Sequence, residues 1–277
     1  MTHVLQDGPN IGIIAGGGQF PYLIAQEARR MGLSVVVCGF HGHTDPGLEE
    51  MADAFQLLHL GQLNKLLAWF HGHGVRRLCM AGTINKPRAL DLRPDLRAAR
   101  VIFSLRDKGD DSLLRAVLGE LEKEGFCVLP AADLVPALRC PQGTLTRKEP
   151  TSDDWENIRY GWPIAAEMGR MDIGQCIVVR QSMILAVECL EGTDATLRRG
   201  AELGGKGCIA LKMVKPGQDE RVDLPSIGLT TIRNLIEGGY SALAVEADRT
   251  LFFDRMESLA LADKHKLAVV ALPRTFQ

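Results

Sequence analysis

The sequence predicts an α/β protein with a Rossmann-like N-terminal domain followed by a second, mixed α/β domain. Three observations support this prediction. Short apolar runs alternate with stretches of helical periodicity in the first half, a stretch rich in proline follows at 130–150, and the alternation then resumes in a different order. Strands that each lead into a helix of this length favour parallel pairing with right-handed crossovers.

In the first half, apolar residues at three- and four-residue spacing mark the helices. Ile24, Ala28 and Met31 share one face in this way. Gly32 is suited to end that helix, because glycine adopts a positive φ without a Cβ clash. The predicted strands are 11–15, 35–38, 54–59, 77–81 and 126–129, and the predicted helices are 20–31, 63–73 and 113–124.

A domain boundary is expected near Val135, where the alternating pattern breaks and proline and polar residues accumulate. This boundary divides the chain into domains 1–135 and 136–277. In the second domain the predicted strands are 175–180, 184–188, 207–212, 242–246 and 268–271, and the predicted helices are 152–171, 193–203, 230–238 and 255–265.

Composition excludes several classes of protein. The formal net charge of -2 gives no basic field for nucleic acid, so no nucleic-acid partner is expected. The seven cysteines have no CxxC spacing, which argues against a zinc site or a disulfide framework and favours buried, reduced thiols. The first residues lack the features of a signal peptide, and no apolar run approaches the roughly 20 residues that span a bilayer. We therefore expect a soluble, intracellular protein whose membrane contact, if any, is peripheral.

A glycine-rich turn between the first strand and the first helix is the first candidate binding element. Gly16, Gly17 and Gly18, followed by Gln19, would let backbone N–H groups and the helix N-terminus face an anion. The spacing is neither GxGxxG nor a P-loop, so phosphate or nucleotide contact is favoured over standard dinucleotide binding. A tight turn without a ligand is the alternative.

A second loop, AGTINKP, follows the strand 77–81. Because ligands of open parallel sheets bind beyond the carboxyl ends of the strands, Gly82 and Thr83 are expected at the same edge as the glycine-rich turn. Lys86 would offer a charge to a phosphate. Further on, Lys108 precedes Asp110 and Asp111 at the start of the next helix, where one aspartate is explained by an N-cap role alone.

The second half contains a denser set of charged residues. Glu191, Thr193 and Asp194 surround the start of a predicted helix, and Thr193 or Asp194 is well placed as its N-cap. Lys212 ends a strand and precedes an irregular loop that contains Arg221 and Asp223. Carboxylates near cations suit Mg²⁺-assisted attack on a phosphate. A salt-bridged surface loop is the alternative.

Two other kinds of site have no support. The histidines in His41-Gly-His43 and His71-Gly-His73 lack the HExxH spacing of a zinc hydrolase. The chain also has no Gly-x-Ser-x-Gly turn, which argues against a serine hydrolase of the triad type.

Five motifs in order resemble the UDP-2,3-diacylglucosamine pyrophosphatases of the lipid A pathway, the class distinct from the metallophosphoesterase form. They are IGIIAGGGQFP, AGTINKP, KGDDSLLR, MDIGQ with CLEGTDA, and KPGQDERVDLPSIG, and the resemblance extends over 11–272. It implies a UDP-binding N-terminal domain, a catalytic hydrolase domain and a homodimer. It also implies Mg²⁺-dependent attack of water on the α-phosphate of UDP-2,3-diacylglucosamine, giving UMP and 2,3-diacylglucosamine 1-phosphate.

The resemblance also implies roles for particular residues. The family's critical aspartate falls on Asp223, as metal ligand or base, and substrate contacts fall on Glu191, Asp194, Lys212 and Arg221. With such a substrate, a cytoplasmic enzyme peripherally associated with the inner membrane is expected. Two alternatives are a non-catalytic sensor of a UDP-sugar lipid and a nicotinamide-dependent oxidoreductase, although the missing GxGxxG argues against the latter.

Overall fold

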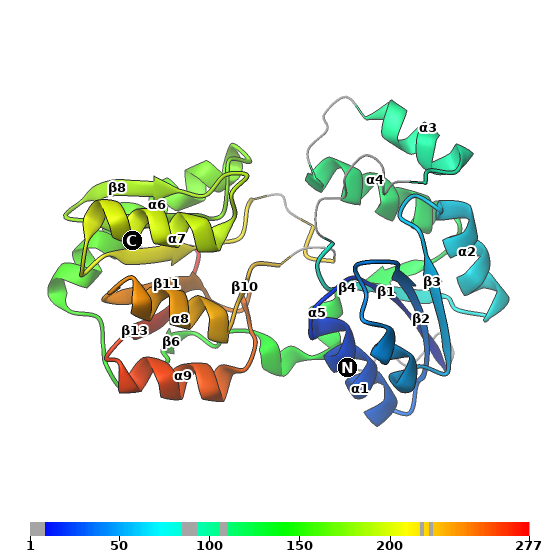
Figure 1. Cartoon of the computed structure of the whole chain (residues 1–277), viewed down its shortest axis with the longest axis horizontal. Coiled ribbons are helices and arrows are strands. Elements are labelled where there is room, and N and C mark those ends of the chain that lie inside the picture. The colour runs from blue at the N-terminus through cyan, green and yellow to red at the C-terminus, as the bar shows by residue number, and fades with distance from the viewer. Residues whose placement is uncertain (1–8, 85–92, 106–109, 217–218, 222–223, 277) are drawn as a thin grey trace. The chain divides into compact units, whose positions relative to one another are not determined.

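The computed structural model describes residues 9–84, 93–105, 110–216, 219–221 and 224–276. The chain divides into two compact units, Met1–Pro136 with Asp219–Val222, and Ala137–Gln218 with Asp223–Gln277 (Figure 1). A short segment from the second half of the sequence therefore groups with the first unit, which a single boundary near Val135 does not describe. The predicted roles of the two domains in binding and catalysis stay predictions.

The first unit is built on a parallel five-stranded sheet. Its elements are β1 (Asn10–Ala15), α1 (Phe20–Arg30), β2 (Ser34–Phe40), the 3-10 helix η1 (Pro46–Met51), β3 (Ala54–Leu58), α2 (Leu63–Gly72), β4 (Arg77–Ala81), α3 (Leu96–Ser104), α4 (Asp110–Lys123), β5 (Cys127–Leu129) and α5 (Ala131–Leu134), and the 3-10 helix η2 (Pro136–Leu138) follows. The strand order is β3-β2-β1-β4-β5 with parallel pairing throughout. This is the order of a Rossmann-like sheet, as predicted.

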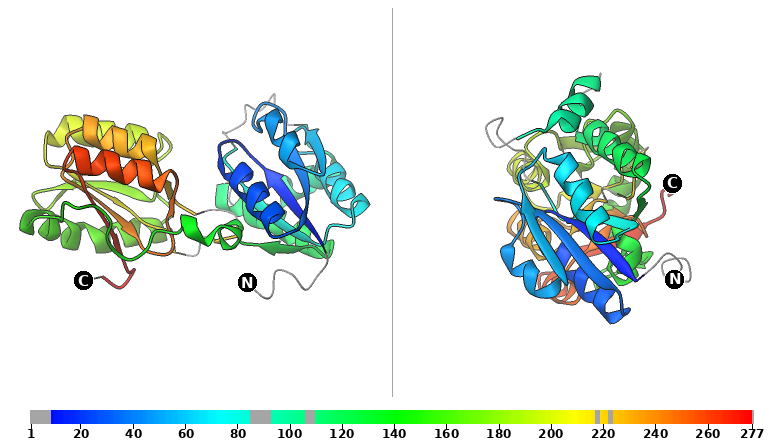
Figure 2. Two further views of the ribbon diagram at one scale, coloured as in Figure 1. Left: turned by 90° about the horizontal axis from the view of Figure 1, so that it is seen from below. Right: turned by 90° about the vertical axis from the view of Figure 1, so that its right-hand side faces the viewer.

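Helices cover both faces of this sheet (Figure 2). On one face α1 packs with η1 and α5 around Ile24 and Val37. On the other face α2, α3 and α4 enclose a core that includes Phe70 and Leu121. Strands buried on both faces read as nearly continuous apolar runs, which is why the sequence pattern identified them.

The second unit holds a mixed sheet of six strands. Its elements are β6 (Gly143–Thr144), α6 (Ser152–Arg170), β7 (Cys176–Arg180), β8 (Met183–Val187), α7 (Thr193–Gly204), β9 (Ile209–Lys212), β10 (Ser226–Ile227), α8 (Leu229–Glu237), β11 (Ala242–Glu246), β12 (Leu251–Phe252), α9 (Arg255–Lys264) and β13 (Ala268–Leu272). The order is β6-β13-β11-β9-β7-β8. β9, β11 and β13 are parallel, whereas β6 and β7 pair antiparallel with their neighbours. The predicted mixed α/β class is confirmed.

Glycines let two helices approach this second sheet closely. A Cβ on Gly161 of α6 would lie 2.4 Å from Leu211 Cδ1, and one on Gly200 of α7 would lie 2.6 Å from Val178 Cγ2. Both distances are too short for a real Cβ atom, so the packing of these helices requires glycine at these positions. α6 covers one face in this way, and α7, α8 and α9 cover the other.

The structure adds elements that periodicity did not indicate. The helix α3, the 3-10 helix η1 and the two-residue strands β6, β10 and β12 were not predicted, and α4 begins at Asp110 rather than at residue 113. Two-residue strands are defined by a partner far away in sequence, so a local pattern cannot reveal them. In the part of the chain that the structure describes, no helix combines the length and the apolar character needed to cross a membrane.

Gly200→Ala should destabilise the protein, because the added methyl group overpacks α7 against Val178. We expect the free energy of unfolding to fall by about 1–3 kcal/mol. The matched control is Gly119→Ala in α4, where the new Cβ meets open space. Removing a helical glycine there should stabilise the protein by up to about 1 kcal/mol. Calorimetric unfolding of both variants measures the difference, and equal effects would contradict the packing described.

Cys127 and Cys189 are exposed, which corrects the expectation that the thiols are generally buried, while the other five cysteines are buried. Burial raises the pKa of Cys38, Cys79 and Cys176 to about 12. A thiol reagent at mildly alkaline pH should therefore modify two thiols of the native protein quickly and all seven after denaturation. Mass spectrometry identifies the sites, and fast modification of Cys38 or Cys79 would contradict this expectation.

Candidate functional site

In the first unit, the glycine-rich turn is joined to the loop after β4 by backbone hydrogen bonds. Gly16 N–H donates to Ala81 O at 2.8 Å, Gly17 N–H donates to Thr83 O at 2.7 Å, and Thr83 N–H returns to Gly17 O at 3.1 Å. The two loops therefore lie together at the carboxyl edge of β1 and β4, and the predicted placement at one edge is confirmed.

The close approach of the two loops explains two of the glycines, Gly16 and Gly82, without a ligand. A Cβ on Gly16 would lie 2.6 Å from Thr83 O, and one on Gly82, whose φ is +91°, would lie 2.5 Å from Gly17 O. Gly18 has a φ of +85°, which favours glycine, and nothing lies near its Cβ position. Because Gly16 and Gly17 donate their N–H groups to carbonyls, these two N–H groups are not available for the predicted anion contact.

For several other predicted binding residues of the first unit, the structure gives little or no information on side-chain contacts. Thr83 is described and exposed. Lys86 and Lys108 lie outside the described residues. Asp110 and Asp111 begin α4, but their side chains are likewise outside the described part of the structure.

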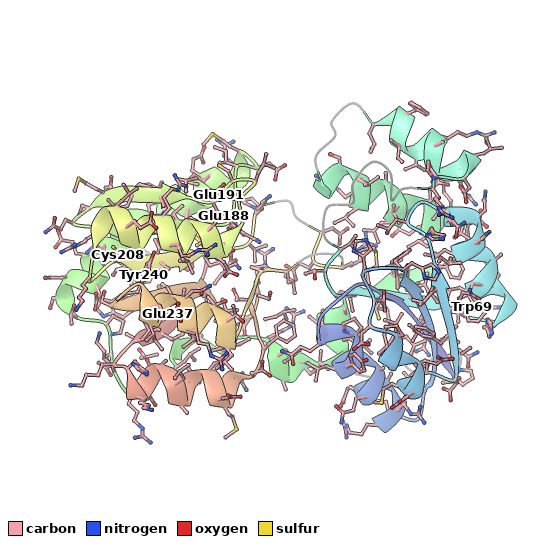
Figure 3. The ribbon with its side chains drawn as sticks, in the orientation of Figure 1. Trp69, Glu188, Glu191, Cys208, Glu237 and Tyr240 are labelled. Carbon is pink, nitrogen blue, oxygen red and sulfur yellow. The ribbon has the colours of Figure 1, made fainter. Side chains whose placement is uncertain are left out.

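In the second unit, two buried charged side chains and a half-buried hydroxyl form a polar network. Thr193 Oγ1–H donates to Glu188 Oε1 at 2.9 Å, and Lys212 Nζ donates to Thr193 Oγ1 at 3.1 Å. Lys212 Nζ also donates to the carbonyl of Ser226 at 2.9 Å. One hydroxyl thus connects a carboxylate to an ammonium group, and Figure 3 shows where Glu188 lies.

The charged groups of this network are shielded from water, but not all of their hydrogen-bonding positions are filled by described residues. Glu188 is 8% exposed and Lys212 is 6% exposed. Glu188 Oε2 is buried and makes no hydrogen bond with any described residue. An ammonium group has three donors, and the bonds to Thr193 and Ser226 account for two of them. The network can therefore accept one hydrogen bond or cation and can donate one hydrogen bond to an anionic oxygen.

The position of the network in the sheet favours a ligand site. Lys212 is the last residue of β9, and Glu188 directly follows β8, which runs in the same direction. Thr193 is the first residue of α7. In open α/β sheets, ligands bind beyond the carboxyl ends of the strands, and the start of a helix adds a favourable field for an anion.

The predicted N-cap role of Thr193 or Asp194 is wrong. The N-cap of α7 is Gly192, with a φ of +80° and no capping side chain. The hydroxyl of Thr193 is instead used by Glu188 and Lys212, and Asp194 Oδ1 accepts from Asn234 Nδ2 at 2.8 Å.

Glu191 lies close to this network in sequence but has partners of its own (Figure 3). It accepts from Arg199 Nη2 at 2.9 Å and from the N–H of Cys189 at 3.2 Å. Hydrogen bonding to backbone N–H groups, its own first, and the charge of Arg199 lower the pKa of Glu191. Glu191 is therefore an ionised carboxylate beside the network whose oxygens already accept hydrogen bonds from the protein.

Arg221 is held by two carboxylates within the first unit. Its guanidinium donates to Asp219 at 2.6 Å and to Glu122 at 2.5 Å. The hydrogen bonds to Asp219 and then Glu122 raise the pKa of Arg221. For this residue, the alternative of a salt-bridged loop describes the structure better than an open phosphate contact.

Asp223, the predicted catalytic residue, lies outside the described residues. Among the residues that are described, no group of three or more His, Cys, Asp or Glu side chains could hold a metal ion. Mg²⁺ in proteins is often held by only one or two carboxylates together with water and phosphate oxygens. Glu188 Oε2, which has no hydrogen-bond partner among the described residues, is the kind of carboxylate oxygen that such a site uses.

Sequence reasoning did not select Glu188 as a site residue. The available signal was its place directly after an apolar strand at the ligand-binding edge. It was also not possible to foresee that Ser226, beyond the irregular loop, supplies a carbonyl to Lys212.

Models of two domains match the chain in the expected order. The LpxI N-terminal domain matches residues 10–138, and the LpxI C-terminal domain matches residues 141–270. The chain belongs to the LpxI family. The resemblance found in the five sequence motifs is thereby confirmed.

Among LpxI proteins, one similar relative is the UDP-2,3-diacylglucosamine pyrophosphatase LpxI of Caulobacter vibrioides. It is 37% identical over 274 residues, covering 95% of this chain and 97% of the relative. A solved structure, N5-carboxyaminoimidazole synthetase from Staphylococcus aureus complexed with ADP, is 19% identical over 63% of this chain and only 38% of that one. Its TM-score of 0.26 is too low to support any conclusion.

Lys212→Met should destabilise the second unit, because it leaves the buried carboxylate of Glu188 without its cation. We expect a loss of about 3–5 kcal/mol. Glu188→Gln combined with Lys212→Met should recover part of the lost free energy of unfolding. The coupling energy between the two substitutions should be about 1–3 kcal/mol. Urea unfolding of the unsubstituted protein, the two single variants and the double variant, a double-mutant cycle, measures these free energies.

The control for this cycle is Lys215→Met. Lys215 pairs with Asp172 at 2.8 Å, and that carboxylate is largely exposed. An ion pair of this kind contributes about 0–1 kcal/mol. Strictly additive effects of the Glu188 and Lys212 substitutions would show that the network does not couple them.

Proposed function

We propose that this chain hydrolyses the pyrophosphate bond of UDP-2,3-diacylglucosamine in lipid A biosynthesis. Water attacks the α-phosphate, and the products are UMP and 2,3-diacylglucosamine 1-phosphate. The observation that carries this proposal is the similarity, over 95% of the chain, to a relative that bears this name. The buried polar network at the carboxyl edge of the second sheet supports it.

In this proposal the second domain, 136–277, is catalytic, and Lys212 is its phosphate-binding cation. Its ammonium is fixed by Thr193 and Ser226 and keeps one donor for a phosphoryl oxygen. Glu188 orients the Thr193 hydroxyl so that the oxygen can accept from Lys212. Donors held in place before the reaction stabilise developing charge without reorganising.

Asp223 and Mg²⁺ complete the proposed site. Asp223 stands three residues before Ser226 in the sequence, in the loop that connects β9 to β10. Its role as metal ligand or as base is left open, and Glu188 Oε2 would be a further ligand. When bound, Mg²⁺ offsets the charge of the phosphoryl oxygens.

The first domain, 1–135, binds the UDP portion in this proposal, through Gly18, Gln19 and the loop of Thr83. A peripheral association of a cytoplasmic homodimer with the inner membrane would give access to a diacylated substrate. These points rest on the family resemblance. Light scattering measures the oligomeric state, and fractionation of cells measures the location.

Hydrolysis in ¹⁸O water with Mg²⁺ should place the label in UMP and none in the sugar phosphate, because the attacked phosphorus keeps the new oxygen. Chelation should stop the release of UMP, and added Mg²⁺ should restore it. Mass spectrometry of both products provides the measurement. Label in the sugar phosphate would refute attack at the α-phosphate, and bound but intact substrate would favour the sensor.

Asp223→Ala should lower UMP release at least about 100-fold while substrate binding persists, because only the chemical step loses a group. The matched control is Asp219→Asn, in the same loop, where the carboxylate is paired with Arg221. This control should retain activity within a few-fold. Full activity of Asp223→Ala would remove Asp223 from the mechanism.

A further inference from the structure

The helix α3 of the first unit presents a face that the unit itself does not use. Ala98 and Val101 are buried in the core, whereas Leu96 is 78% exposed and Phe103 is 88% exposed. Residues 96, 100 and 103 are spaced by four and three positions, so they share one face of the helix. Arg100, which is exposed, therefore lies between two exposed apolar side chains.

The opposite side of α3 is fixed to its own unit. Arg97 donates to Glu120 at 2.7 Å and to Glu124 at 2.6 Å, and both acceptors belong to α4 or directly follow it. The carboxylate of Asp95 caps the helix by accepting from the N–H groups of Arg97 and Ala98. The carboxylates of Asp95, Glu120 and Glu124 thus already accept hydrogen bonds from α3. The exposed face of the helix combines apolar and basic side chains.

A cavity of about 660 Å³ lies beside the start of α3 and extends this basic character. It is lined by Lys65 and Arg93 together with the imidazoles of His41 and His59, whose ring centroids are 4.7 Å apart. None of the described residues that line it carries a carboxylate. Burial, and then the nearby Arg93, His41 and Lys65, lower the pKa of His59, as expected where cationic groups converge.

The cavity and the helix are joined by the backbone. The N–H of Arg93 donates to Leu60 O at 2.9 Å, and the N–H of Asp95 donates to Gly61 O at 3.0 Å. Arg93 therefore lies both at the cavity and three residues before Leu96. Trp69, labelled in Figure 3, adds a half-buried ring to the lining, and its indole N–H donates to Val37 O at 3.2 Å.

We propose that the exposed face of α3, Leu96, Arg100 and Phe103, together with Arg93 and Lys65, docks on an anionic phospholipid bilayer. Apolar side chains enter the interface between headgroups and acyl chains, while basic side chains contact lipid phosphates. This inference rests on the proposed membrane association and names the surface for it. It does not depend on the reaction.

Charge favours a bilayer over a second copy of the chain. A two-fold contact brings the same patch of both subunits together. On this surface such a contact would bring the basic side chains of one copy, Arg93 and Arg100 among them, onto the same basic patch of the other copy, and like charges across an interface are unfavourable. An anionic bilayer supplies both the opposite charge and an apolar layer.

The test is sedimentation of the full-length protein with vesicles of phosphatidylcholine, with and without phosphatidylglycerol. Binding should require phosphatidylglycerol and weaken with salt. Leu96→Ser with Phe103→Ser, and separately Arg100→Glu, should each lower partitioning at least about tenfold. The matched control is Met256→Ser in α9, whose side chain is 87% exposed but belongs to the other unit; it should bind as the unsubstituted protein does.

Release of UMP from detergent-dispersed substrate should stay within two-fold in all these variants, so that a failed docking surface and a failed catalytic assignment give different results. Calorimetry confirms that each variant folds, and Arg100→Glu remains informative if the double variant does not. Unchanged vesicle binding, or an equal loss for Met256→Ser, would overturn the proposal. So would a change from dimer to monomer with vesicle binding intact, or binding of inorganic phosphate without any vesicle binding.

Discussion

The hydroxyl of Thr193 connects a buried carboxylate to a buried ammonium group, and the second unit depends on that connection. Removing two charges from water costs several kcal/mol for each ion, which only good pairing and hydrogen bonding offset. Here Glu188 follows β8, Thr193 begins α7 and Lys212 ends β9. The cost of burial is therefore offset only when all three elements are correctly placed, so the network specifies their arrangement as well as a site.

Close backbone packing surrounds this network and leaves it little freedom. A Cβ on Gly174 would lie 2.0 Å from the carbonyl oxygen of Glu188, and Gly200 lets α7, which carries Thr193, lie directly on β7. Protein interiors packed in this way transmit small displacements rather than absorb them. A change at either glycine is thus expected to reach the polar network, even though neither glycine is a member of it.

Periodicity and edge rules predicted most of the fold, because they depend on local sequence. The parallel order also placed Gly16 near Gly82 correctly, since all strand ends of one direction share an edge. Local sequence could not show that the Thr193 hydroxyl bonds to Glu188 instead of capping α7, or that Arg221 pairs with Glu122, 99 positions away. Such partners are decided by tertiary contacts, and so are the unmatched oxygen of Glu188 and the two-residue strands.

The charges at the carboxyl edge of the second sheet bear on the proposed metal. Lys212 is matched by Glu188 and Lys215 by Asp172, whereas Arg249 and Arg274 share Glu246. Arg199 likewise pairs with Glu191. These pairs leave a single cation in excess, and the pyrophosphate of a nucleotide sugar would bring more negative charge to this edge than one cation offsets. Lys212 can orient one oxygen but cannot offset the whole anion, and a divalent cation that arrives with the substrate would supply the missing charge. The small excess of positive charge among these described residues therefore gives the proposed Mg²⁺ a physical reason that is separate from the family resemblance.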